Sequence, residues 1–180
     1  MSNTSPSSDL QEHLQLLLQE YRENPTSHVV LREIGKTYRD MAQFDTAMFY
    51  LEQTLTLNPG DWEALVVLGS LYTEKEDYEA ALSHYSRAYE LSNETDLLGL
   101  VGEALYHLKR FEMAESHLRL TLRLEGSLQR GFSHFILGKV LCALDRFEEA
   151  FDEFRAAEKF KKSDETSRWL KFAKTKMGIH

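Results

Sequence analysis

The chain has 180 residues, of which 42% are hydrophobic, and a formal net charge of −8 at pH 7. This acidic balance excludes nucleic acid as the main partner, because a nucleic-acid binder needs a basic stripe that displaces phosphate counterions. No apolar run reaches the roughly 18 residues of a membrane span, and residues 1–9 lack the basic and apolar regions of a secretory signal. With a single cysteine, Cys142, these features predict a cytoplasmic protein. Membrane association is not expected.

The N-terminal stretch divides into two parts. Residues 1–7 are mostly Ser, Thr, Asn and Pro, a composition that buries nothing and predicts disorder. Beyond them, apolar residues recur at helical spacing, at Leu14, Leu17, Leu18 and Tyr21. This pattern predicts a helix over residues 8–24, which we expect to cap the N-terminal end of the fold.

A stretch in the middle of the chain, residues 62–93, shows the unit of organisation. Its apolar residues follow helical periodicity in two successive segments of about fourteen residues. Gly69 lies in the first segment and Ala81 in the second, and small residues of this kind let two helices cross closely. The stretch therefore predicts a helical hairpin.

The same pattern recurs along the chain. The glycine and the small residue both return in steps of 34, 33 and 36 residues, and an aromatic residue followed by an acid opens each second helix. The glycines are Gly35, Gly69, Gly102 and Gly138; the small residues are Ala47, Ala81, Ala114 and Ala150; the aromatic residues are Phe44, Tyr78, Phe111 and Phe147.

This period and pattern resemble the tetratricopeptide repeat over most of the chain. The resemblance implies an all-α fold, a right-handed superhelical array of antiparallel helix pairs forming a single domain over residues 8–180. The register gives repeats at 28–58, 62–92, 95–125 and 129–162. The longer step into the fourth repeat places two extra residues at 125–130, where we expect an irregular loop. The tyrosine column of Tyr38 and Tyr72 becomes Leu105 and Leu141, substitutions that keep the size of the side chain.

A last helix is predicted over residues 163–177, with Trp169, Phe172, Ala173 and Met177 on one face. It has no partner helix, so we expect Trp169 and Phe172 to cap the fourth repeat. Residues 159–176 hold seven of the 21 basic residues and two of the 29 acidic ones. Two interpretations stay open: a solvated face with cations near a helix C-terminus, or a docking surface for an acidic partner or a membrane surface. The same helix is a candidate for joining protomers in a homo-oligomer.

The sequence predicts no catalytic residue, no cofactor and no metal site. The glycines lie inside helices one repeat apart, which excludes the usual phosphate-binding loops. His107 and Cys142 share a predicted face, but two ligands are too few for a closed zinc site. Acidic pairs such as Glu148 and Glu149 lie at helix starts, where solvated carboxylates favour the helix.

In the family that this chain resembles, the first helices of successive repeats line a concave groove that binds partners. The register places there Arg32, Lys36, Arg39, Val66, Ser70, Leu100, Glu103, Phe132, Phe135, Ile136 and Lys139. One end of the predicted groove is therefore basic and the other apolar. Relatives that hold the acidic tails of heat-shock chaperones use a carboxylate clamp, but Val67, Asp96 and Leu100 occupy its positions here, so this kind of tail binding is not expected.

The leading hypothesis is a non-enzymatic protein–protein interaction module, a scaffold, adaptor or assembly factor that binds a peptide or helix of a partner protein in its groove. One alternative is a small cytosolic chaperone of the secretion type for a specific client. A remote alternative is a regulatory subunit or enzyme with a cryptic site, which would need convergent polar groups with perturbed titration.

Overall fold

The computed structural model describes residues 6–124 and 129–179 of the chain. Over these residues it contains ten α-helices and no strand, which confirms the all-α prediction. The chain divides into two compact units, residues 1–77 and 78–180, and each is described by itself. Disorder is predicted for residues 1–7; residues 1–5 lie outside the described residues, whereas residues 6 and 7 begin the first helix. Most of the predicted loop, residues 125–128, lies outside the described residues as well. The single-domain boundaries stay a prediction.

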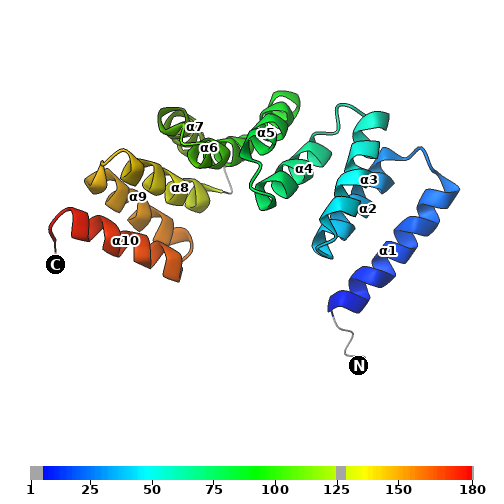
Figure 1. The fold of residues 1–180 in the computed structure, drawn as a ribbon, viewed down its shortest axis with the longest axis horizontal. Helices are drawn as coiled ribbons and strands as arrows, with labels where there is room; N and C mark the ends of the chain where they lie inside the picture. The colour runs from blue at the N-terminus through cyan, green and yellow to red at the C-terminus, as the bar shows by residue number, and fades with distance from the viewer. Residues whose placement is uncertain (1–5, 125–128, 180) are drawn as a thin grey trace. The chain divides into compact units, whose positions relative to one another are not determined.

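Unit 1 holds four helices: α1 (Pro6–Glu23), α2 (His28–Asp40), α3 (Phe44–Leu57) and α4 (Trp62–Glu74) (Figure 1). Helix α1 begins two residues before the predicted boundary, with Pro6 in its first turn, where a proline is favoured. Leu14 and Leu17 pack in one cluster with Val30 and Ile34 of α2. Helix α1 thus covers the outer side of α2 with the predicted apolar stripe.

Unit 2 holds six helices, and each packs against the next. They are α5 (Tyr78–Ser92), α6 (Leu97–His107), α7 (Phe111–Arg123), α8 (Arg130–Ala143), α9 (Phe147–Phe160) and α10 (Asp164–Lys176). In addition, α6 packs against α8, two helices apart in the chain. Figure 1 shows α8, α9 and α10, coloured yellow to red, as neighbouring layers at the C-terminal end. Over the described residues, no helix combines the length and apolar character needed to cross a membrane.

The repeated glycines sit where paired helices cross, but their partner is not the predicted small residue. A Cβ added to the glycine would lie within 2.7 Å of a large side chain one helical turn beyond that small residue. The pairs are Gly35 with Leu51, Gly102 with Leu118, and Gly138 with Phe154. These large side chains are fully buried. At these three positions the glycine therefore makes room for a core side chain.

The turn inside each helix pair uses a left-handed residue that is not glycine. Positive φ angles of 57–59° occur at Ala42, Glu76, Lys109 and Asp145, again in steps of 34, 33 and 36 residues. The next amide donates a hydrogen bond of 2.8–2.9 Å to the carbonyl five residues back, that of Tyr38, Tyr72, Leu105 or Leu141. This is the bonding of a Schellman helix end.

Helix α10 closes unit 2 with a capped start. The Ser163 side chain accepts a hydrogen bond from the amide of Thr166, and Thr166 and Ala173 are buried. The Trp169 ring stacks 5.8 Å from that of Phe154. Phe172 stays 42% exposed. Trp169, rather than Phe172, therefore does most of the covering predicted for this helix.

Candidate functional site

The predicted groove residues fall into two sets. Arg32, Lys36 and Arg39 of α2 and Val66 and Ser70 of α4 lie in unit 1, whereas Leu100 and Glu103 of α6 and Phe132, Phe135, Ile136 and Lys139 of α8 lie in unit 2. Among these residues, the structure brings Lys139 and Phe135 of unit 2 together. A single groove that joins both sets stays a prediction.

In unit 1, the side chain of Arg32 is bound to acidic residues at the start of α4. Its side chain is 16% exposed, and Nη1 donates hydrogen bonds of 3.0 Å to both carboxylate oxygens of Asp61. Nη2 forms an ion pair of 2.7 Å with Glu63. Arg32 therefore fastens α2 to the start of α4.

The other two cations of the basic stripe are also paired. Lys36 Nζ lies 3.0 Å from Glu33, and Arg39 Nη2 lies 2.8 Å from Asp40. The cations of the predicted basic stripe therefore already have acidic neighbours on α2 and α4. Their role in binding a partner stays a prediction.

Asp61 is the centre of this polar cluster and the N-cap of α4. It accepts a 3.0 Å hydrogen bond from the Ala64 amide, and His28 Nδ1 lies 2.9 Å from its carboxylate. Burial alone would raise the pKa of Asp61, but the hydrogen bonds from Ala64, Arg32 and His28 outweigh burial and lower it. Asp61 thus stays ionised and supports the local fold.

In unit 2, the apolar end of the predicted site is divided between core and surface. Ile136 is 1% exposed and belongs to the core, so the prediction that it contacts a partner is wrong. One residue along an α-helix turns the side chain by about 100°, which separates Ile136 from Phe135. Phe132 and Phe135 are partly exposed.

These two phenylalanines line a cavity of about 640 Å³, here called the α8 cavity. Ala157, Phe160 and Lys161 at the end of α9 form a second wall, and Ser163, Glu165 and Thr166 at the start of α10 form a third, with Gln129 and Gly131 at the α8 end. A Cβ on Gly131 would lie 2.6 Å from Phe160 Cβ, so this glycine permits the close approach of α8 and α9. A volume of this size accommodates a large side chain or a small ligand.

Phe160 is not among the predicted groove residues, although the sequence carries a signal for it. Ten residues after each repeated alanine stands a large apolar residue: Leu57, Leu91, Leu124 and Phe160. Phe160 is 57% exposed. Only the packing of α8 against the end of α9 shows that this member of the column lines a cavity.

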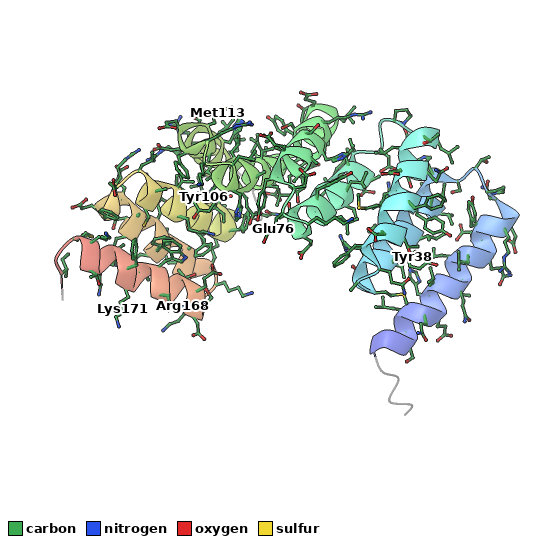
Figure 2. All side chains as sticks on the ribbon, in the orientation of Figure 1. Tyr38, Glu76, Tyr106, Met113, Arg168 and Lys171 are labelled. Carbon is green, nitrogen blue, oxygen red and sulfur yellow. The ribbon has the colours of Figure 1, made fainter. Side chains whose placement is uncertain are left out.

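Beside the α8 cavity lies a face formed by α6 and α8. Lys139 Nζ sits 4.7 Å from the ring centroid of Tyr106 and 5.6 Å from that of Phe135; Figure 2 labels Tyr106 on α6. Glu103 is partly buried, and burial raises the pKa of this carboxyl group while Lys139 opposes the rise. The face therefore offers two aromatic rings, one cation and one carboxyl group.

The remaining polar groups of this region serve packing. Burial raises the pKa of the Cys142 thiol to about 11, so it stays protonated at neutral pH. His134 Nδ1 lies 2.6 Å from Glu153 and ties α8 to α9. Across the residues described by the structure, no group of three or more His, Cys, Asp or Glu side chains is arranged to hold a metal ion.

Comparison with known proteins defines the class. Residues 40–121 match the family model of the anaphase-promoting complex, cyclosome, subunit 3. The chain is 26% identical over 140 residues to tetratricopeptide repeat protein 21B of Mus musculus, covering 74% of this chain and 10% of that protein. It is 33% identical over 94 residues to the BBSome complex member BBS4 of Bos taurus, covering 52% and 18%. The chain thus spans between a tenth and a fifth of these curated relatives.

Solved structures agree on the fold. The crystal structure of the APC/C hetero-tetramer Cut9-Hcn1 matches with a TM-score of 0.81 and 18% identity, over 93% of this chain and 34% of that chain. YrrB, described as a TPR protein with an unusual peptide-binding site, matches with a TM-score of 0.73 and 18% identity, over 88% and 82%. The crystal structure of MamA matches with a TM-score of 0.73 and 20% identity, over 85% of this chain and 89% of that chain. The helix pairs and their repeat make the chain a helical-repeat scaffold. It is a tetratricopeptide repeat protein.

Proposed function

We propose that this chain is a non-enzymatic scaffold that binds a segment of a partner protein at the α8 cavity. The tetratricopeptide fold is that of a protein–protein interaction module, and YrrB is described by its peptide-binding site. The observation that carries the proposal is the pair Phe132 and Phe135, which stay partly exposed in a cavity of about 640 Å³. Partly exposed aromatic residues that line a pocket are the usual anchors of protein binding.

The bound segment carries an apolar anchor residue. Phe132, Phe135, Ala157 and Phe160 are the apolar side chains of the cavity wall, and an apolar side chain of the partner gains free energy by leaving water there. Lys139, held between Tyr106 and Phe135, offers a cation at the edge. Glu103 interacts electrostatically with Lys139 and extends this proposed surface. The role of Leu100 stays a prediction. The cytoplasmic location and the secretion-chaperone alternative stay predictions.

The test selects peptides from a random library on the intact chain and measures their affinity by calorimetry. Phe132→Ala should weaken a selected peptide by about 2 kcal/mol. Phe132 is a better probe than Phe135, because the Phe135 ring lies 5.9 Å from the core residue Phe154 and its loss also affects folding. Phe49→Ala is the matched control, since Phe49 is 56% exposed on α3 of the other unit.

Equal affinities for the parent and Phe132→Ala, with both variants folded, would remove the α8 cavity as the binding site. An equal loss of peptide affinity in Phe49→Ala would show that exposed aromatic residues in general, and not the α8 cavity, bind the peptide.

A further inference from the structure

Over the described residues, several cations outside the C-terminal segment are paired with carboxylates, whereas the cations of this segment are not. Arg32, Lys75, Arg110, Arg119 and Arg146 each form an ion pair with a carboxylate. In contrast, within the part of the chain that the structure describes, no carboxylate lies within 4 Å of any basic residue between 159 and 176. These residues are Lys159, Lys161, Lys162, Arg168, Lys171, Lys174 and Lys176. Figure 2 shows Arg168 and Lys171 projecting outward from α10.

Part of this charge surrounds a recess. A cavity of about 390 Å³, here called the basic trough, lies between α9 and α10. Its lining is Phe151, Arg155 and Glu158 from α9 with Ser167, Leu170, Lys171 and Lys174 from α10. Three cations therefore face one carboxylate in the same recess, and Glu158 accepts a hydrogen bond of 3.4 Å from Ser167.

Two of the cations converge on one ring. The guanidinium carbon of Arg155 lies 5.8 Å and Nζ of Lys174 lies 5.7 Å from the centroid of Phe151. The ring face attracts each cation, but two cations at one ring, with Lys171 beside them, repel one another. An anion between them would remove that repulsion.

We propose that the basic trough binds an acidic segment of a partner protein, with carboxylates at Arg155, Lys171 and Lys174 and an apolar side chain over Phe151 and Leu170. A protein segment fits better than a lipid surface for two reasons. The lining combines the apolar residues Phe151 and Leu170 with three cations, so it suits a chain that alternates acidic and apolar residues. The chain as a whole carries a charge of −8, which repels an extended anionic bilayer more than a short peptide. The basic trough shares no lining residue with the α8 cavity. This proposal therefore does not depend on the proposed function of the α8 cavity.

The experiment uses the full chain and a fluorescein-labelled peptide that alternates pairs of glutamates with leucines, measured by fluorescence anisotropy. The triple variant Arg155→Gln, Lys171→Gln, Lys174→Gln should weaken binding by roughly tenfold or more. The charge-preserving variant Arg155→Lys, Lys171→Arg, Lys174→Arg should keep binding within about threefold of the parent. Raising the salt concentration should weaken the parent and the charge-preserving variant alike.

The control variant removes the same number of exposed cations elsewhere, through Arg22→Gln, Lys109→Gln and Arg123→Gln. It should bind the peptide like the parent, whereas the same peptide with glutamine in place of glutamate should not bind. Equal weakening in the trough and control variants would overturn the proposal in favour of the general field. Undiminished binding by the folded trough variant would overturn it as well. Trough-dependent binding to vesicles with about 30% phosphatidylserine, without peptide binding, would reassign the site to a membrane surface.

Discussion

Helices α2 and α10 both carry a row of cations, but the two rows have different surroundings. On α2, Arg32 is paired with Asp61 and Glu63 of α4, and Lys36 and Arg39 with acids of α2 itself. On α10, Lys174 and Lys176 lie over the rings of Phe151, Phe147 and Phe172 instead of beside carboxylates.

The difference shows that a charged row in a repeat protein has no fixed role. A cation paired with a neighbouring helix contributes to the stability of the fold, and it is then not available to a partner without loss of that contact. A cation over an aromatic ring keeps much of its charge free to attract an anion. The acids that the next helix supplies decide between the two roles.

The largest effect is expected from removing the carboxylate of Asp61, which pairs with Arg32 of α2. Asp61→Ala should lower the free energy of unfolding by about 3 kcal/mol, because it deletes the α4 cap and leaves Arg32 without its main partner. Urea unfolding followed by circular dichroism measures the change. Glu165→Ala, an exposed acid in the first turn of α10, should stay within about 0.5 kcal/mol. Equal, small losses in both variants would contradict the structural role assigned to the α2 cations.

A second comparison concerns the glycine crossings that both units share. Gly138→Ala should cost about 2 kcal/mol, since the new Cβ would lie 2.5 Å from the buried Phe154 ring. Gly35→Ala should cost less, because the Leu51 side chain, 2.7 Å from the new Cβ, shifts more easily than a ring. Thermal melts of both variants give the order. A larger loss of stability in Gly35→Ala than in Gly138→Ala would show that the rigidity of the Phe154 ring does not determine the size of the loss.

The Asp61 cluster also predicts a dependence of stability on pH. The folded-state pKa of Asp61 is lowered from its ordinary value of 3.8, so its contribution is complete above that value and is lost as pH falls through the folded pKa. His28, Arg32 and Glu63 face or neighbour this carboxylate. The stability difference between the parent and Asp61→Asn should therefore be constant at neutral pH and shrink below 3.8. A difference that persists unchanged in acid would exclude ionisation as its source.

The smallest effects are expected at the left-handed turn residues, which are Ala42 in unit 1 and Asp145 in unit 2. Ala42→Gly should stabilise the chain by about 1 kcal/mol, because glycine adopts the left-handed φ of 57° without the Cβ penalty. Asp145→Gly should increase the stability by a smaller amount, since aspartate tolerates this conformation better than alanine. Differential scanning calorimetry resolves both shifts. A loss of stability in Ala42→Gly would mean that the turn does not impose this conformation in solution.

By itself, the sequence determined the helical-repeat class, the pairing of helices and the places where glycine is needed. These features depend on spacing along a single helix or between adjacent helices, and the columns of Gly35, Gly102 and Gly138 carry that information directly. The starts of α4 and α10 lie within one residue of the predicted boundaries, 62 and 163, where Asp61 and Ser163 cap the helices.

Only the tertiary structure decided which of those residues are available to a partner. Arg32 is paired with Asp61, 29 residues away in the chain, and Ile136 lies in the core. Phe160 and Phe151, which the predicted groove register does not include, line recesses. Burial and pairing depend on which side chains neighbouring helices bring into contact, and a helical period carries no information about those distant side chains.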